Sequence, residues 1–335
     1  MRIRSFDPAG ASEPDLADYH ALRSAADVVD FPRDPPPTYG AAIGRLRDAP
    51  VPGAVSRHWV AGRFVGSAKV SLPGGDNAGL AIVGVVVHPE SRGRGVGTEL
   101  LRAALPALHG CRVAIGSHMT QDGSGARWTE RLGFVVTSRA VLQRLTVGSV
   151  PVHVWDVAVP PGYRLARWTG AAPADLLDSY AAARDAMHDA PANRLSYRVP
   201  RWTGPVIRAS ERELASSGVE ERVVVAIDAA DGRVIGVTAM RIRPHSPEIG
   251  VQNDTSVLAA HRGHGLGRAM KAAMMRRLVA ERPDVERIMT TTAADNTYMI
   301  TVNHALGYDT LRTLVTTEVP VEKLVEALAS RQVPR

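Results

Sequence analysis

Two glycine-rich segments have the residue types and spacing of a turn that binds phosphate. The first reads RGRGVG over Arg92–Gly97, and the second reads RGHGLG over Arg262–Gly267. Each opens a helix-like stretch, so its backbone N–H groups should lie unpaired at the positive end of a helix dipole. Glycines let an anion approach the backbone closely, and the arginine adds positive charge. The two segments therefore predict two sites for phosphate groups.

The spacing of the glycines excludes two common nucleotide-binding motifs. Neither copy ends in the Gly-Lys-[Ser/Thr] of the P-loop, and the glycines run G-x-G-x-G rather than G-x-G-x-x-G. A glycine-rich turn can also serve only the sterics of a strand-to-helix connection. Each copy is, however, followed by a Leu-Gly-aromatic corner, at Leu132–Phe134 and at Leu306–Tyr308. Two copies in the same context favour the binding interpretation.

The elements around the turns indicate that the chain contains two copies of one domain. The β-branched run Val83–Val87 predicts a central strand before the first turn. After the second turn, a helix is predicted by apolar residues that recur every four positions, at Leu266, Met270, Met274 and Leu278. The breaker Pro160–Gly162 marks the join. We expect an α/β fold (α+β, mixed sheet) of two tandem domains, over residues 1–150 and 151–335, each a twisted mixed central sheet flanked by helices.

Composition limits the function classes. The chain has 335 residues, of which 45% are hydrophobic and 22% charged, which suits a globular protein of about two domains. Its net charge of +6 is dispersed and no nucleic-acid-binding module is present, so we expect no nucleic-acid partner. The single cysteine, Cys111, excludes an intrachain disulfide, and the eleven histidines lack metal-ligand spacing, so we expect no metal. Without a signal peptide or a run of about 18 apolar residues, we expect a cytoplasmic protein that does not engage membranes.

With these motifs in place, the sequence resembles the GNAT superfamily of acyl-coenzyme A-dependent N-acetyltransferases. The resemblance rests on both glycine turns and on NTYMITVNHALGY over Asn296–Tyr308, which is similar to the family's later helix and corner. It covers both halves, so the whole chain resembles a tandem GNAT protein, similar in layout to the mycothiol synthases. The stretches MHDAP (Met187–Pro191) and QNDTSV (Gln252–Val257) resemble in particular a group of actinobacterial tandem acetyltransferases.

The resemblance implies acetyl-CoA as co-substrate, with its pantetheine along the end of each motif strand and its pyrophosphate on each glycine turn. An amine would attack the thioester directly, while a backbone N–H near Val257–Leu258 polarises the carbonyl. In the second half the implied coenzyme-binding residues are Thr255, Ser256, Val257, Arg262, Gly263, His264, Gly265, Leu266, Gly267, Arg268 and Asn296. In the first half they are Val85, Val86, Val87, Arg92, Gly93, Arg94, Gly95, Val96, Gly97 and Thr98.

The sequence departs from the family at the acid and base. The family's glutamate base falls at Ala81 and Val251, and its tyrosine acid falls at Thr129 and Asn303. The halves differ in what remains, because the first motif strand is apolar whereas Gln252–Ser256 is polar throughout. Five polar residues in a central strand indicate a wet cleft. We therefore expect the C-terminal domain to be catalytic and the N-terminal domain to be non-catalytic or degenerate.

Three residues are candidates for the chemistry. Asp254 or Glu248 would be the base, directly or through a water; Asp254 can instead be a structural carboxylate paired with an arginine. Tyr298 would be a displaced acid, unless it is simply a buried helix tyrosine. Strand alternation places Asp254 with Gln252 and Ser256 on one face of the strand. Outside the strand, Trp202 is a candidate wall of the acceptor pocket.

The leading hypothesis is an enzyme that transfers an acetyl group from acetyl-CoA to a primary amine of a small molecule, as a monomer or homodimer. The missing glutamate and tyrosine also fit an acyl-CoA-binding regulatory or structural protein without catalysis. A protein N-acetyltransferase is the third alternative, because the sequence does not define the acceptor.

Overall fold

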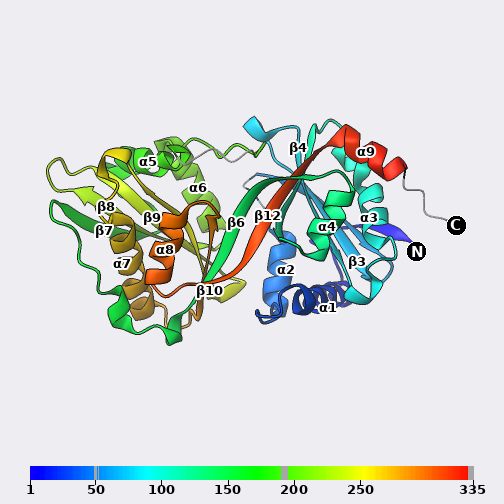
Figure 1. Ribbon diagram of the computed structural model, residues 1–335, viewed down its shortest axis with the longest axis horizontal. Helices are drawn as coiled ribbons and strands as arrows, with labels where there is room; N and C mark the ends of the chain where they lie inside the picture. The colour runs from blue at the N-terminus through cyan, green and yellow to red at the C-terminus, as the bar shows by residue number, and fades with distance from the viewer. Residues whose placement is uncertain (49–50, 52, 190–194, 331–335) are drawn as a thin grey trace. The chain divides into compact units, whose positions relative to one another are not determined.

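The computed structural model describes residues 1–48, 51, 53–189 and 195–330. They form two compact units (Figure 1). Unit 1 contains Met1–Arg139, Asn193–Arg198 and Thr313–Arg335, and unit 2 contains Ala140–Ala192 and Val199–Arg312. Each unit combines helices with a mixed sheet, which confirms the expected fold class.

Unit 1 is built on strands in the order β1-β2-β3-β4-β5-β12. Neighbours from β1 to β4 pair antiparallel, β4 and β5 pair parallel, and β12 pairs antiparallel with β5. The strands are β1 (Ile3–Phe6), β2 (Val55–Ala61), β3 (Gly66–Leu72), β4 (Leu80–Val87), β5 (Val113–Thr120) and β12 (Asp309–Pro320). The parallel pair needs a crossover, which the helix after the glycine turn supplies.

Helices cover both faces of this sheet. Ser12 caps α1 (Glu13–Asp30) and Thr38 caps α2 (Tyr39–Arg47), each by accepting a backbone N–H of the first turn. These two helices bury one face of the sheet with Phe6, Leu22, Leu46, Val60 and Val86. The other face packs against α3 (Val96–Ala104), α4 (Ser124–Arg131) and α9 (Val321–Ala329). The two faces thus have separate apolar cores.

Unit 2 repeats this plan in the order β6-β11-β10-β9-β8-β7. Its single parallel pair among the described residues is again the motif strand and the strand after the crossover, β10 and β11. The strands are β6 (Val135–Thr146), β7 (Tyr163–Thr169), β8 (Glu220–Asp228), β9 (Val234–Arg243), β10 (Ser246–Val257) and β11 (Arg287–Ala293).

The helices of unit 2 also divide between two faces. On one face lie α5 (Leu177–Asp185) and α6 (Gly204–Ser216), which pack through Tyr180 and Ile207. On the other face lie α7 (Leu266–Glu281) and α8 (Thr297–Ala305). The predicted apolar stripe of α7 is buried there, which confirms that helix. Among the described residues, no helix of either unit has the length and apolarity needed to cross a membrane.

The compact units differ from the continuous segments 1–150 and 151–335 expected from the sequence. The chain leaves unit 1 within β6, and Ala140–Thr146 of that strand pair with β11. It returns within β12, where Leu314–Pro320 pair with β5. Each half of the sequence therefore contributes its final strand to the sheet of the other unit. The sequence repeat alone cannot show whether the final strands are exchanged, since the strand sequences are the same with and without the exchange.

The charged side chain of Lys271 is buried in unit 2. Lys271 on α7 is 2% exposed, and its ammonium lies 5.3 Å from the centre of the Tyr308 ring. Burial lowers the pKa of Lys271 to about 7 from an ordinary value of 10.5. Between these two pH values the unfolded chain binds more protons than the folded chain, so the free energy of unfolding rises with pH across this range.

Lys271→Met should therefore stabilise unit 2, because methionine keeps the chain volume and removes the buried ammonium. We expect the free energy of unfolding to increase by about 1–3 kcal/mol at pH 6, and the gain to shrink as the pH approaches 10. Chemical denaturation at several pH values measures this. A variant that is less stable than the wild type at pH 6 would show that the ammonium makes a net favourable contact.

Candidate active site

The glycine turns open α3 in unit 1 and α7 in unit 2, as predicted. Gly95 and Gly265 take the N-cap positions in the left-handed region, with φ of 81° and 79°, where glycine alone is free of strain. A Cβ at either position would meet no atom within 4 Å, so the backbone borders open space. The first N–H groups of each helix, at residues 96–98 and 266–268, have no acceptor inside the helix. Both turns can therefore receive an anion.

The first arginine of each turn clamps the turn to its motif strand. Nε of Arg92 donates to the carbonyl of Val87 at 3.1 Å, and Nε of Arg262 donates to the carbonyl of Val257 at 2.9 Å. Each arginine thus bonds to the last residue of the strand before it. This shared contact explains why both copies need arginine at this position.

The parallel strands separate before they reach the turns. In unit 2, β10 and β11 pair only from Ile249/Arg287 to Gln252/Thr290, although β10 continues to Val257. In unit 1, β4 and β5 pair only from Leu80/Val113 to Ile82/Ile115. Beyond these points the two described strands of each pair no longer form ladder hydrogen bonds with each other. An extended ligand with amide groups can pair with main chain exposed in this way.

Only β10 of the two motif strands has a bulge. Its register with β9 shifts between Gln252 and Thr255, whereas β4 pairs with β3 without interruption from Ile82 to Val87. Because of this bulge, the side chains of β10 do not alternate strictly between the two faces, and that expectation from the sequence is wrong. Gln252 Nε2 and Thr255 Oγ1 both bond to Thr238 Oγ1, so these two side chains share a face. Asp254 and Ser256 instead face α5.

Asp254 lies at this bulge against an arginine. Nε and Nη2 of Arg184 both contact its Oδ2 at 3.4 Å, while 31% of the Asp254 side chain stays exposed. The other carboxylate oxygen, Oδ1, is left for a different partner. The neighbouring Asn253 Nδ2 is buried and has no hydrogen-bond partner among the described residues. Such a group is costly unless a ligand or water pairs with it.

Arg184 belongs to a buried cluster that sequence reasoning missed. Arg184 is 1% exposed, and its Nη2 lies 3.5 Å from Oε1 of Glu221. Its guanidinium carbon lies 3.8 Å from the centre of the Trp202 ring. Arg184 also donates to the Tyr180 hydroxyl at 3.2 Å. A pairing of Asp254 with an arginine is one of the two expectations from the sequence. No spacing rule links a helix arginine to a strand bulge about 70 residues away, so the sequence could not identify Arg184 as that arginine. Trp202 therefore contacts the residue that holds Asp254.

Glu248 lies far from this cluster. It forms an ion pair with Arg287 at 3.8 Å near the start of β10, six residues or about 20 Å of strand before Asp254. Of the two candidate bases, the geometry favours Asp254.

The candidate acid and its neighbours lie on α8. Tyr298 is 58% exposed in the first turn, so the alternative of a buried helix tyrosine is wrong. Asn296 caps the helix by accepting the N–H of Met299 at 3.1 Å. Asn303, which occupies the family's tyrosine position, is fully buried, and its Nδ2 donates to Gln143 of β6 at 2.8 Å. Its side chain is therefore committed to the core.

The other predicted coenzyme residues of unit 2 differ in what they can offer. Ser256 Oγ donates to the Ala183 carbonyl at 2.6 Å, so this residue offers a ligand its main chain. His264 Nδ1 lies 3.2 Å from the His261 carbonyl, and Leu266 is buried in the core. The side chain of Arg268 is exposed. The described residues contain no group of three or more His, Cys, Asp or Glu side chains that could hold a metal ion.

His188 lies in the segment between α5 and α6. His188 Nε2 lies 3.3 Å from the Pro200 carbonyl and 3.5 Å from Asp185. Ala190 and Pro191, the end of the MHDAP stretch, lie outside the described residues.

Unit 1 differs at its corresponding positions. The amino groups of Arg92 donate to both carboxylate oxygens of Asp30 at 2.7 and 2.8 Å. Asp30 therefore neutralises this arginine at the edge of the first glycine turn. Thr129, at the family's tyrosine position, bonds back to the Ala126 carbonyl. Thr98 Oγ1 accepts the Trp128 indole N–H at 3.4 Å, and Val85 and Val87 pack beneath α3.

Removing Arg184 should destabilise unit 2, because Arg184 contacts the carboxylates of Glu221 and Asp254. Arg184→Met leaves Glu221 buried with one cationic neighbour fewer, so we expect a loss of about 3 kcal/mol in the free energy of unfolding. Arg201→Met is a matched control, because Arg201 is 71% exposed in its ion pair with Asp185, and we expect it to cost less than about 0.5 kcal/mol. Equal losses in urea denaturation would contradict a structural role for Arg184.

Comparisons with known proteins find acetyltransferase domains in both halves of the chain. An acetyltransferase (GNAT) domain profile matches residues 54–136, and an acetyltransferase (GNAT) family profile matches residues 190–308. The mycothiol acetyltransferase of Nocardia farcinica is 30% identical over 267 residues, which cover 77% of this chain and 80% of that protein. The mycothiol acetyltransferase of Saccharomonospora viridis is 28% identical over 282 residues, which cover 79% and 86%.

Solved structures share this fold. A tandem GNAT protein from the clavulanic acid biosynthesis pathway is 25% identical with a TM-score of 0.76, over 96% of this chain and 98% of that chain. A GCN5-related N-acetyltransferase from Sphaerobacter thermophilus shares the fold, at 17% identity and a TM-score of 0.69, over 96% and 95% of the two chains. This chain therefore belongs to the GNAT family of acetyltransferases, as an acyl-CoA-dependent N-acyltransferase with two such domains in tandem.

Proposed function

We propose that unit 2 transfers the acetyl group of acetyl-CoA to a primary amine of a small molecule, with Asp254 as general base. GNAT acetyltransferases use acetyl-CoA as co-substrate. The observation that carries the proposal is the bulge in β10, which brings Asp254 and Asn253 to the point where β10 and β11 separate. The glycine turn of α7 follows on the same strand.

The described residues fit the coenzyme. The N–H groups at the start of α7 would hold its diphosphate, and the unpaired edge of β10 would hold its pantetheine amides. Asn253 Nδ2, buried without a partner, would gain an acceptor from the bound ligand. Once bound, the coenzyme supplies an activated acyl group on a thiol whose ordinary pKa is roughly 8.5.

Asp254 would take the proton of the incoming amine. Both Arg184 contacts go to Oδ2, so Oδ1 can accept the proton directly or through a water. Arg184 stabilises the negative charge of the carboxylate and fixes its orientation. Trp202, stacked on the guanidinium, keeps that arginine in place.

The leaving thiol has little need of an acid, because a thiolate of this basicity leaves unaided. Tyr298 is exposed in the first turn of α8, and Met299 beside it lies next to Gly267 of the glycine turn. A proton donor at Tyr298 would thus be close to the start of α7.

Three features support unit 2 rather than unit 1 as the catalytic unit. β4 has no bulge, and its side chains beyond Ile82 are apolar. In addition, Asp30 forms an ion pair with Arg92 of the first turn. An anionic carboxylate beside the turn opposes the binding of a diphosphate. The relatives named mycothiol acetyltransferase support a small-molecule acceptor.

Asp254→Asn tests the base. The amide keeps the size of the side chain but cannot accept the proton, so we expect kcat/KM to fall by about 100-fold while the affinity for CoA is unchanged. Thiol release from acetyl-CoA with a panel of amines measures the rate, and calorimetry measures the affinity. A loss confined to Glu248→Gln would transfer the role to Glu248. No thiol release from the wild type with any amine would favour a coenzyme-binding protein without catalysis.

Gly265→Val tests the diphosphate site. The new side chain would project into the open space in front of α7, so we expect the dissociation constant for CoA to rise roughly tenfold or more. Gly170→Val is a matched control, because Gly170 has a φ of 76°, open space around it, and a position at the end of β7. Equal CoA affinities of the two variants in calorimetry would contradict the assignment of the turn.

A further inference from the structure

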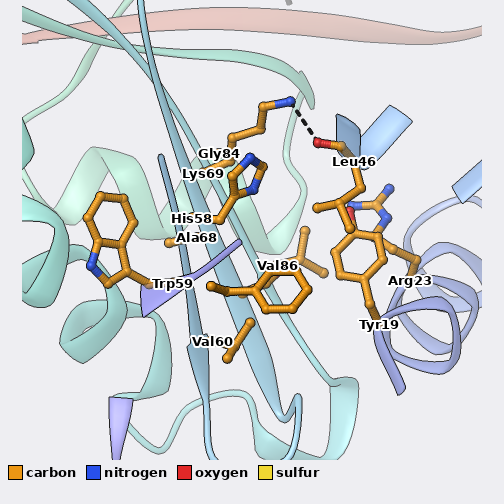
Figure 2. A pocket seen from close by; sticks show the side chains of 12 residues that line it. Tyr19, Arg23, Leu46, His58, Trp59, Val60, Ala68, Lys69, Gly84 and Val86 are labelled. Atoms are coloured by element: carbon orange, nitrogen blue, oxygen red, sulfur yellow. Dashed lines mark hydrogen bonds between the residues drawn. The ribbon is translucent and has the colours of Figure 1, made fainter. Parts of the chain in front are cut away.

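A cavity of about 160 Å³ lies in unit 1, on the face of the sheet that α1 and α2 cover (Figure 2). Its floor is a row of residues that lie directly opposite one another on four successive strands: Phe6, His58, Lys69 and Gly84. A second row on the same face adds Val60, Ser67 and Val86. The cavity is separate from the glycine turn, which opens α3 against the other core.

Two polar groups in the floor have unused hydrogen-bonding capacity. His58 is 8% exposed, and its imidazole makes no hydrogen bond with the described residues. The Lys69 ammonium donates to the carbonyl of Leu46 (Figure 2). It also donates to the carbonyl of Asp48, at the end of α2. An ammonium has three N–H donors, so one has no acceptor among the residues that the structure describes.

The charged side chains that line the cavity are cationic. Arg23 and Lys69 line it, and no carboxylate is among the described residues that do so. Asp27 pairs with Arg23 at 2.8 Å, and Asp48 and Asp7 act on Lys69 and His58 from outside the lining. Burial and the nearby Lys69 cation lower the pKa of His58 to about 4, and burial lowers the pKa of Lys69. Burial disfavours any charge in the cavity, and the Lys69 cation favours an anion over a second cation there.

Much of the lining is apolar. Phe6, Val60 and Val86 come from the sheet, and Tyr19 and Leu46 come from the helices that cover it. A cavity of about 150 Å³ lined by apolar side chains is large enough for benzene. The space therefore suits a ligand of one small ring or a short branched chain, and it is smaller than the pockets of drug-sized ligands.

We propose that this cavity binds a small monocarboxylic acid with an apolar body. The carboxylate accepts the third N–H of Lys69 and an N–H of His58, and the apolar body lies against Phe6, Leu46 and Val86. This site is independent of acetyl transfer in unit 2, because every residue that forms it belongs to unit 1.

Calorimetry of the full chain tests the proposal with benzoate and isovalerate as probes, and with benzylamine as the cationic counterpart. We expect both carboxylates to bind and benzylamine not to. Lys69→Met should weaken benzoate binding by about tenfold or more, because it keeps the apolar stem but removes the ammonium.

A second variant keeps the test valid if Lys69→Met perturbs the end of α2. A Cβ at Gly84 would meet no atom within 4 Å and needs no left-handed backbone, so Gly84→Val should fill the cavity and abolish binding without unfolding the sheet. Gly74→Val is the matched control, since Gly74 also has open space and an extended backbone but lies outside the cavity; it should bind benzoate like the wild type. Benzylamine binding as tightly as benzoate, unchanged benzoate affinity in Gly84→Val, or no carboxylate binding at about 10 mM would overturn the proposal.

Discussion

The separation of β10 from β11 is the constraint on which the rest of the candidate site depends. Two parallel strands that stop pairing after Gln252 and Thr290 leave the facing main-chain groups beyond that point, in the described strands, without a ladder partner in each other. Such groups are stable only where water or a ligand replaces the missing strand. The strands end beside a helix whose first N–H groups are also free. One extended ligand with amides along its length and a diphosphate at its end satisfies both sets of groups.

The two units share this constraint but use it differently. In unit 2 the bulge of β10 turns Asp254 toward α5, where Arg184 holds one of its oxygens. In unit 1 the motif strand runs straight, and Asp30 binds the arginine of the turn. The scaffold of the chain is therefore duplicated, while the charged residues that could act on a substrate are not. Unit 1 instead places its unused polar groups in a cavity beneath α1 and α2.

Periodicity and spacing predicted the scaffold because each feature depends on local sequence. The turns at Gly95 and Gly265 need a left-handed backbone, and the stripe from Leu266 to Leu278 needs a buried helix face. The bulge of β10 between Gln252 and Thr255 and the exchange of β6 and β12 depend on pairing between distant segments, and nothing in the local sequence encodes them. The site was predicted only in part for the same reason. Asp254 could be singled out as a polar residue in a central strand, whereas its partner Arg184 could not.

A crystal structure of the full chain with bound coenzyme A tests the account most directly. The account predicts a coenzyme with its diphosphate on the N–H groups of residues 263–268, its pantetheine between β10 and β11, and its sulfur near Asp254. A coenzyme bound elsewhere, or a β10–β11 gap closed by the protein itself in that structure, would contradict it.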